Sequence, residues 1–599
     1  MVKKKLVLSA MAVLATLSLA ACSNKSSSSS SSTAPTGASV KLSESYDNTA
    51  AVSQAANKGT LKVAEANNSP FQGITDPALA SNAEDTDVFA PGGGDNLFNV
   101  DKNYKIVNGG LANLKLDRAN NTATITLRKN AKWSNGMPVT AKDVEYPYEV
   151  IGNKNTTSQQ FSSDFNDIQG MAAYHAGKAK TISGFTYPNG QNGRTTVIHF
   201  AHVTPSMQYS GNSFMWAAVE PYEYVKNVPI AKLAASTQVR KNPIFTGPYK
   251  LNKLVEGEST TWVPNPYYYG KKPQIKHISI NVVSSNNIDK AVQSKKYDFV
   301  TGGLEGTDYN ELKGLKNYHM IGSPALSYDY FGFNLGYFDT KTGENVMDPK
   351  AKMANKNLRE AMLYALNLDQ VAKKFGYGMT WRANTLIPPV FKQYYNASEK
   401  GFPLNIKKAN QLLDKAGYKK QGKWRVQPNG KPLTIYFGAM TGTSAQAAEY
   451  QDYLQQWHKI GLNVQLVGGK TMEMNSFYST LQAPKQNKID VWAGAWSVSS
   501  EPTPTQIYGK DATFNMGHFV SAKNTQLMNE MNSNKAWNQS YRIKAFKQWQ
   551  TYMNQQAAVG PDSFSYAWAP VNKRVKGYNI NPANNEFWSN LSLTCPHVQ

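Results

Sequence analysis

The chain of 599 residues is poor in cysteine and in long apolar segments. Cys22 and Cys595 are its only cysteines, so the fold cannot depend on a framework of several disulfides, which secreted domains often use. Cys595 stands four residues from the last residue, and we interpret it as an idle thiol. After residue 20 no apolar run approaches the ~20 residues of a membrane-spanning helix, which excludes a protein with several spans.

Catalytic motifs are missing too. The sequence contains no HExxH, no G-x-S-x-G and no G-x-x-x-x-G-K-[ST], the patterns of zinc peptidases, serine hydrolases and phosphate-binding loops. His199 and His202 form the only close histidine pair. On a strand, a spacing of three residues points them to opposite faces, which argues against a shared metal. The missing motifs argue against an enzyme without excluding one, and we expect a protein that performs no covalent chemistry and holds no cofactor or metal.

The first 58 residues have the composition of a targeting signal and a spacer. Lys3, Lys4 and Lys5 precede an apolar run over residues 6–20, which has the length of a signal-peptide core. The run ends in LAAC, which resembles the lipobox of bacterial lipoproteins and implies that residues 1–21 are removed and Cys22 is lipidated. The alternative is an ordinary secretory signal with an incidental cysteine. Residues 22–58, with serine throughout 26–32, are predicted to be a flexible tether.

The net charge is strongly positive. It is +23 for the whole chain, with 64 Lys and Arg against 41 Asp and Glu, and +20 (61 − 41) once the three lysines of residues 1–21 are gone. The basic residues are scattered instead of forming the dense patch that nucleic acid requires, so nucleic acid is excluded as a partner. Attraction to an anionic membrane or cell wall accounts for the charge. We therefore expect a protein on the outer face of the cell membrane, held by its lipid.

The body has the alternating pattern of an α/β protein. Residues 59–63 and 122–127 read as strands, and residues 357–375 and 407–416 as amphipathic helices. Residues 433–439, 444–460 and 462–466 read as strand, helix and strand, which predicts a βαβ unit and hence a parallel sheet.

Two loops are candidates for binding. Residues 490–497 read as a strand that runs into a loop with Ser497, Ser499, Ser500 and Glu501, and α/β proteins bind ligands where strands end in polar loops. The glycine run at 91–95 lacks the rest of a dinucleotide motif and reads as a turn that lets backbone come close to a partner.

Several longer motifs point to a family. ATITLRKNAKWSNGMPVTAKDVEYPYEV at 123–150 is similar to the signature of the family 5 extracellular solute-binding proteins, the peptide and nickel receptors of ABC importers. TGPYKL, VPNPYYYGKKP, YFGFNL, LREAMLYALNLDQV and ANQLLDKAGY follow in the family's order. PGGGDNLF, GKAKTISG, AWSVSSEP and NMGHF resemble the oligopeptide-binding lipoproteins of Gram-positive bacteria.

The resemblance implies a two-lobed clamp of the type II periplasmic-binding-protein kind. Residues 59–100, 243–327 and 561–599 would build the first lobe, residues 101–242 a subdomain inserted in it, and residues 328–560 the second lobe. Two hinge strands would cross near residues 327 and 561. A monomer would bind a peptide between the lobes as an added strand, largely through its backbone, and deliver it to the permease subunits of an ABC importer.

One motif departs from the family. Many peptide-binding members carry an aspartate for the ligand's α-amino group in the stretch that matches residues 496–502, where this chain has serines. The departure implies that no carboxylate holds the peptide's N-terminus and that longer peptides bind in varied register. Glu501 could take the place of the missing aspartate. The alternative is that Glu501 has a structural role at the turn before Pro502. The predicted peptide contacts are Trp496, Ser497, Val498, Ser499 and Glu501, with Gly93, Gly94 and Asp95 on the opposite lobe.

Three other functions stay open on these data. The same scaffold would serve a receptor for a nickel chelate, a sugar or a peptide pheromone, because the matching motifs belong mainly to the scaffold. A secreted peptidase would need a nucleophile or metal set that the sequence does not display. A chaperone would bind unfolded chains without closing its lobes.

Overall fold

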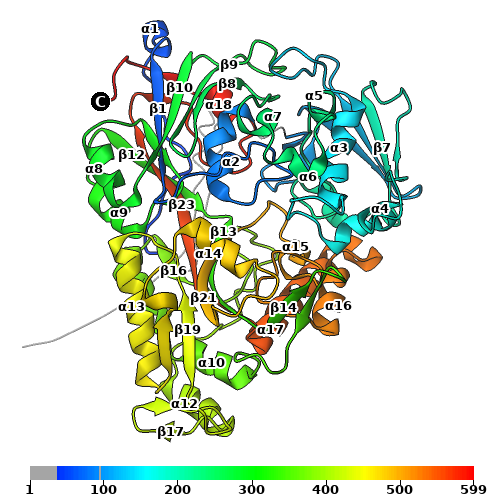
Figure 1. Ribbon diagram of the computed structural model, residues 1–599. Coiled ribbons are helices and arrows are strands. Elements are labelled where there is room, and N and C mark those ends of the chain that lie inside the picture. Colours follow the sequence, from blue (N-terminus) through cyan, green and yellow to red (C-terminus); the bar gives the residue numbers. More distant parts are fainter. Residues whose placement is uncertain (1–36, 94–95) are drawn as a thin grey trace, which may run out of the picture. The chain divides into compact units, whose positions relative to one another are not determined.

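The computed structural model describes residues 37–93 and 96–599, all within one compact unit that spans residues 34–599. Its largest sheet defines the first lobe and has eight strands (Figure 1). Seven of them follow the order β12 (Tyr318–Pro324), β23 (Ser563–Asn572), β11 (Phe299–Thr301), β1 (Thr60–Ala66), β10 (His277–Val283), β9 (Ser259–Pro264) and β8 (Tyr249–Val255), and β16 (Thr380–Arg382) pairs with β23. Strands from the two ends of the chain thus share one sheet.

A second sheet defines the second lobe. Its strand order is β20 (Asn463–Leu466), β19 (Thr434–Gly438), β21 (Val491–Ser497), β13 (Ser327–Phe333) and β22 (Val559–Pro561). β19 runs parallel to β20, and α13 (Ser444–Lys459) connects them, which confirms the predicted βαβ unit. The chain passes from the first sheet to the second between β12 and β13, and returns between β22 and β23.

A third sheet lies in the segment between β1 and β8. It consists of β4 (Ala112–Asp117), β5 (Thr122–Leu127), β7 (Thr195–His199) and β6 (Phe185–Thr186), and α3 (Ala141–Gly152) contacts β7. It has its own apolar core, in which Trp133 and Tyr148 are fully buried. The order of the three sheets agrees with a two-lobed clamp carrying an inserted subdomain, although the exact domain limits remain predictions.

The other elements connect or cover these sheets, and most of them are short. The helices of the first lobe and subdomain are α1 (Gln54–Asn57), α2 (Ala83–Phe89), α4 (Met171–His175), α5 (Tyr222–Val225), α6 (Ile230–Leu233), α7 (Thr237–Arg240), α8 (Ile288–Gln293), α9 (Gly306–Leu312) and α18 (Phe587–Asn590). Those of the second lobe include α12 (Ile406–Lys415), α14 (Met474–Leu481), α15 (Thr505–Tyr508), α16 (Ala522–Met531) and α17 (Gln539–Gln556). Paired strands are β2 (Asn99–Val100) with β3 (Ile106–Val107), β14 (Gly336–Asp339) with β15 (Glu344–Met347), β17 (Lys420–Gln421) with β18 (Trp424–Arg425), and β24 (Val575–Lys576) with β25 (Ser592–Leu593).

The single helix predicted over residues 357–375 is two helices in the structure. α10 (Lys356–Tyr364) ends before α11 (Leu368–Gly376), which begins after Asn367. The Asn367 side chain accepts a hydrogen bond from the backbone N–H of Gln370 and caps the second helix. Apolar residues continue at helical spacing through the break, which is why periodicity alone missed it.

Residues 37–58 were expected in the tether, and here the prediction was wrong. Leu42 is 7% exposed and belongs to the core, and Ser43 bridges Ile321 on the edge strand β12. The Tyr46 ring stacks on His319, with 4.1 Å between centroids. Leu42 and Tyr46 supply the apolar surface that the serine run lacks, and an edge strand offers unpaired backbone groups, so this segment packs on the first lobe.

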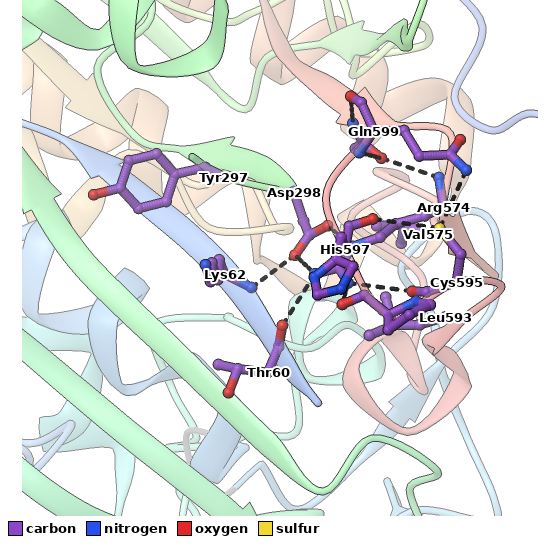
Figure 2. A network of polar contacts seen from close by, with 12 residues as sticks. Thr60, Lys62, Tyr297, Asp298, Arg574, Val575, Leu593, Cys595, His597 and Gln599 are labelled. Carbon is purple, nitrogen blue, oxygen red and sulfur yellow. Dashed lines mark hydrogen bonds and ion pairs between the residues drawn. The ribbon is translucent and has the colours of Figure 1, made fainter. Parts of the chain in front are cut away.

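The C-terminal segment docks on the same lobe through a buried ion pair (Figure 2). Arg574 donates from Nε and Nη2 to the two carboxylate oxygens of Asp298, at 2.5 and 2.7 Å. Its Nη1 donates to the Cys595 carbonyl at 3.2 Å, and its Nη2 to the Thr60 carbonyl at 3.0 Å. One guanidinium therefore joins β11, β1 and the last residues of the chain, and Cys595 serves here through its backbone.

None of the helices in the described part of the chain is both long and apolar enough to cross a membrane. Cys22 and the apolar run before it lie outside the described residues, so the lipid anchor stays a prediction.

Candidate ligand-binding cavity

The two lobes enclose a cavity of about 1160 Å³. This is larger than the ~300–1,000 Å³ of most small-molecule sites. Residues of the first lobe, such as Gln72 and Glu84, line one wall, and Gln159 of the subdomain continues it. The opposite wall belongs to the second lobe, where β21 and the loop after it contribute Trp496 and Ser499.

β21 carries the predicted binding segment to the cavity. It pairs antiparallel with β13, so that Ser497 lies opposite Ser327 at the point where the chain enters the second lobe. The Trp496 ring is parallel to that of Tyr330, 6.2 Å between centroids, and meets Phe514 edge-on at 5.3 Å. These contacts fix an aromatic surface that is partly open to the cavity.

The structure brings the predicted contacts of the second lobe together. Trp496, Ser497, Val498, Ser499 and Glu501 all line the cavity. The Val498 backbone N–H is already engaged, because it donates to the Leu326 carbonyl at 2.7 Å. Val498 can therefore offer a ligand its side chain and carbonyl group, and the two serines remain candidates for hydrogen bonds. Their contact with a ligand stays a prediction.

Glu501 is held by an ion pair at the cavity wall. Its Oε1 accepts a hydrogen bond from Arg542 Nη2 at 2.5 Å, and both side chains are 1% exposed. Its Oε2 accepts from the Thr503 backbone N–H at 3.0 Å. Arg542 on α17 also donates to the Tyr394 hydroxyl at 2.7 Å. This ion pair favours the structural role of Glu501 at the turn, because caging an amine would require the carboxylate to leave a buried partner; the role of Glu501 toward a ligand stays a prediction.

The opposite wall carries carboxylates of a different kind. Glu84 and Asp87 lie on α2, line the cavity, and take part in none of the ion pairs among the described residues. Burial, and then the charge of Glu84, raises the pKa of Asp87 to about 7. Burial and the charge of Asp87 raise the pKa of Glu65, which lies behind them on β1 and is 2% exposed. This corner of the cavity would gain from a positive charge.

The described lining contains no Lys, Arg or His. The same part of the chain holds no group of three or more His, Cys, Asp and Glu side chains placed to bind a metal ion. The cavity of a strongly basic protein is thus neutral to acidic, and nothing in its described wall would form an ion pair with a ligand carboxylate.

The glycine run predicted on the opposite lobe does not reach the cavity where it is described. Gly93 has φ +92° and packs so closely on Gly247 that an added Cβ would lie 2.8 Å from the Gly247 Cα. It is not among the lining residues. The sequence predicted a close approach of backbone at this glycine, and the structure shows one. The backbone that it approaches is that of Gly247 in the same chain. Gly94 and Asp95 lie outside the described residues.

Sequence reasoning missed the polar residues that join the two walls. Gln159 and Gln160 precede no recognisable motif. Asn475 on α14, Gln482 directly after it and Gln506 on α15 belong to segments that read as ordinary helix surface. Each of these residues contacts another that lies hundreds of positions away in the sequence, and no local sequence pattern indicates such a contact.

A cavity that lies between two sheets, with the chain crossing twice from one sheet to the other, defines a two-lobed solute-binding clamp. The family described as bacterial extracellular solute-binding proteins, family 5 Middle, matches residues 106–518. The chain belongs to this family, which confirms the resemblance seen in the motifs.

Two relatives are similar over nearly the whole chain. The oligopeptide-binding protein OppA of Lactococcus lactis subsp. cremoris is 40% identical over 531 residues, 88% of each chain. A solved structure of lactococcal OppA, complexed with an endogenous peptide in the closed conformation, superposes with a TM-score of 0.87 at 39% identity and covers 89% of this chain and 100% of its own.

A more distant structure shows that the fold alone does not define the ligand. NikZ from Campylobacter jejuni, in complex with Ni(L-His), has a TM-score of 0.69 at 19% identity and covers 89% of this chain and 99% of its own. The ligand of the present protein must therefore be argued from its cavity.

Proposed function

We propose that this protein captures oligopeptides between its lobes and delivers them to the permease subunits of an ABC importer, without covalent chemistry. The observation that carries the proposal is the large interlobe cavity, with hydroxyl groups and aromatic rings on one wall. It occurs in a chain that is 40% identical to a protein named for oligopeptide binding.

A peptide suits this cavity chemically. Every peptide offers the same backbone N–H and C=O groups, which must be paired when they are buried. Ser497, at the end of β21, and Ser499, in the loop after it, are exposed and can pair with them, while the rings of Trp496 and Phe514 give apolar side chains a surface. A nickel chelate would need a cleft histidine or arginine, and the described lining contains neither.

The ends of the peptide are not expected to be fixed. Glu501 is neutralised by Arg542, and the described lining has no cation for a terminal carboxylate. The C-terminus can therefore lie at different places in the cavity, and the acidic corner at Glu84 and Asp87 would attract a lysine side chain as well as a free α-amino group, so we propose that peptide length and register vary.

Intrinsic tryptophan fluorescence of residues 23–599 tests the function. Peptides from two to roughly twelve residues are titrated with free and with acetylated N-termini, beside maltose and nickel–histidine. A saturable change with peptides only, indifferent to acetylation, is expected. Loss of binding on acetylation would show a caged amine. A response only to maltose or nickel–histidine would contradict the peptide assignment.

We also propose that Cys22 carries a lipid and holds the protein at the outer face of the cell membrane. The support is the LAAC sequence after an apolar run of signal-peptide length. Replacing Cys22→Ser should move the protein from the membrane fraction to the medium. Unchanged membrane retention would contradict the lipid anchor.

A further inference from the structure

Most of the polar side-chain contacts that join the lobes at the cavity are made between uncharged groups; a carboxylate takes part elsewhere, where the Thr443 hydroxyl donates to Glu305 Oε2 at 2.7 Å. Within the described part of the chain, no ion pair connects the second lobe with the first lobe or its subdomain. Amides and hydroxyls meet instead: Gln72 Nε2 donates to Asn475 Oδ1 at 2.9 Å, and the Ser500 hydroxyl to the Ser210 carbonyl at 2.8 Å.

Gln159 and Gln482 form a reciprocal pair at the cavity. Gln159 Nε2 donates to Gln482 Oε1 at 2.9 Å, and Gln482 Nε2 donates to Gln159 Oε1 at 2.9 Å. Both side chains are half-buried and line the cavity. One residue belongs to the subdomain and the other follows α14 of the second lobe, so both hydrogen bonds exist only while the clamp is closed.

The neighbouring residues extend the same contact. The Thr513 hydroxyl donates to the Gln159 carbonyl at 2.9 Å, and Gln506 Nε2 donates to Gln160 Oε1 at 2.7 Å. A loop of three residues, 158–160, thus meets three separate segments of the second lobe, represented by Gln482, Gln506 and Thr513.

The loop is fixed in position on its own side. The Ser158 hydroxyl donates to the Ala78 carbonyl at 2.5 Å, and Gln160 Nε2 donates to the Ala80 carbonyl at 2.9 Å. Phe161, which follows directly, stacks on the His175 ring with 3.7 Å between centroids. Closure therefore costs this loop little additional conformational entropy, since a preorganised group loses less freedom when it binds.

We propose that residues 158–160 are a latch, and that the Gln159–Gln482 pair sets how long a ligand stays in the closed cavity. The proposal rests on the proposed function, because it needs a peptide in the cavity. Contacts that form only after closure slow the dissociation of the ligand and leave its association rate nearly unchanged. Gln159 and Gln482 are thus positioning residues for closure, whatever the peptide sequence.

A double-mutant cycle tests the latch. Dissociation of a labelled nonapeptide is followed by stopped-flow competition for the wild type, Gln159→Ala, Gln482→Ala and the double variant. Each single variant should dissociate about fivefold faster, with an association rate within about twofold. The double variant should match the singles, because the two side chains act as one unit. Gln169→Ala is the control, since the Gln169 side-chain amide donates to the Phe200 carbonyl within its own subdomain.

Unchanged dissociation in both single variants, or effects that simply add, would overturn the latch. A second measurement does not depend on peptide binding. Fluorescence energy transfer between labels at Asn120→Cys and Asn534→Cys, in a chain without Cys22 and Cys595, reports the closed fraction of the ligand-free protein. Gln159→Ala should lower that fraction, and an unchanged fraction would contradict the latch. A wild type that closes but binds no peptide would instead contradict the proposed function.

Discussion

The carboxylates on the two walls of the cavity differ in whether a cation is paired with them. On the second lobe, Glu501 is paired with Arg542, and the surface around it is aromatic and hydroxylic. On the first lobe, Glu84 and Asp87 face the cavity from α2 and have no ion-pair partner among the described residues.

This difference in pairing indicates that the two walls would contribute differently to ligand binding. A buried carboxylate with a buried guanidinium is stable only as a pair and cannot respond to a ligand without losing its partner. Carboxylates without a partner repel each other, and an approaching cation relieves that repulsion. If the cavity binds a peptide as proposed, the second lobe would supply shape and backbone pairing, and the first lobe would supply the preference for charge.

Breaking the pair on the second lobe should have the largest effect. Arg542→Met leaves Glu501 buried without its cation, because both side chains are 1% exposed. We expect the free energy of unfolding to fall by about 3–5 kcal/mol, measured by denaturant titration.

The matched control is Lys226→Met, which breaks an ion pair with Glu223 whose side chains are 40% and 44% exposed. It should leave the free energy of unfolding nearly unchanged, because an exposed ion pair is screened by solvent. Equal losses in the two variants would mean that burial does not distinguish the pairs, and the contrast between the walls would be lost.

Removing the charges of the first lobe should change which peptides bind. In Glu84→Gln with Asp87→Asn, the affinity for a peptide with a central lysine should fall about tenfold, while a peptide with norleucine at that position should bind as before. Calorimetric titration of the two peptides measures this difference. Asp117→Asn, on an exposed hairpin, is the control, and an equal loss for both peptides would point to damaged packing instead of charge preference.

The pH dependence should follow Asp87. Its pKa of about 7 lies above the ordinary 3.8 because of burial and the charge of Glu84. Between these values the folded, ligand-free protein binds more protons than the unfolded chain, so the contribution of Asp87 to stability falls as pH rises from about 4 to about 7. A lysine peptide favours the ionised form, and its affinity should therefore increase several-fold from about pH 5 to pH 8.

Two measurements check this pH dependence. Calorimetry in buffers of different ionisation enthalpy should detect proton release when the lysine peptide binds near pH 6. Asp87→Asn should flatten the pH profile of affinity. A profile unchanged by that substitution would show that other groups produce it.

Local patterns predicted the scaffold well. β19, α13 and β20 follow directly from alternating and helical periods, and Gly417 and Gly461 mark the ends of α12 and α13 with φ of +84° each. The strand that carries Trp496 to the cavity was also predicted, because its small residues pass into a run of hydroxyls.

Pairing across the chain could not be predicted. Glu501 meets Arg542 at a separation of 41 residues, and Gln159 meets Gln482 at 323. Periodicity and turn signals describe neighbours in sequence, so they identify a carboxylate without telling whether a cation neutralises it. That missing information decides whether Glu501 is free to bind an amine, and only the fold supplies it.

The smallest expected effect concerns the aromatic surface of the second lobe. Trp496 lines the cavity and is partly exposed, whereas Trp492 on the same strand is 1% exposed and donates to the Tyr330 hydroxyl at 3.3 Å. Trp496→Phe should remove most of the fluorescence change on peptide addition and weaken binding only about twofold to threefold, because a ring remains against Phe514. Trp492→Phe should leave the signal nearly intact. If the signal instead survives in Trp496→Phe and disappears in Trp492→Phe, the peptide does not contact the end of β21, and the division of tasks between the walls must be redrawn.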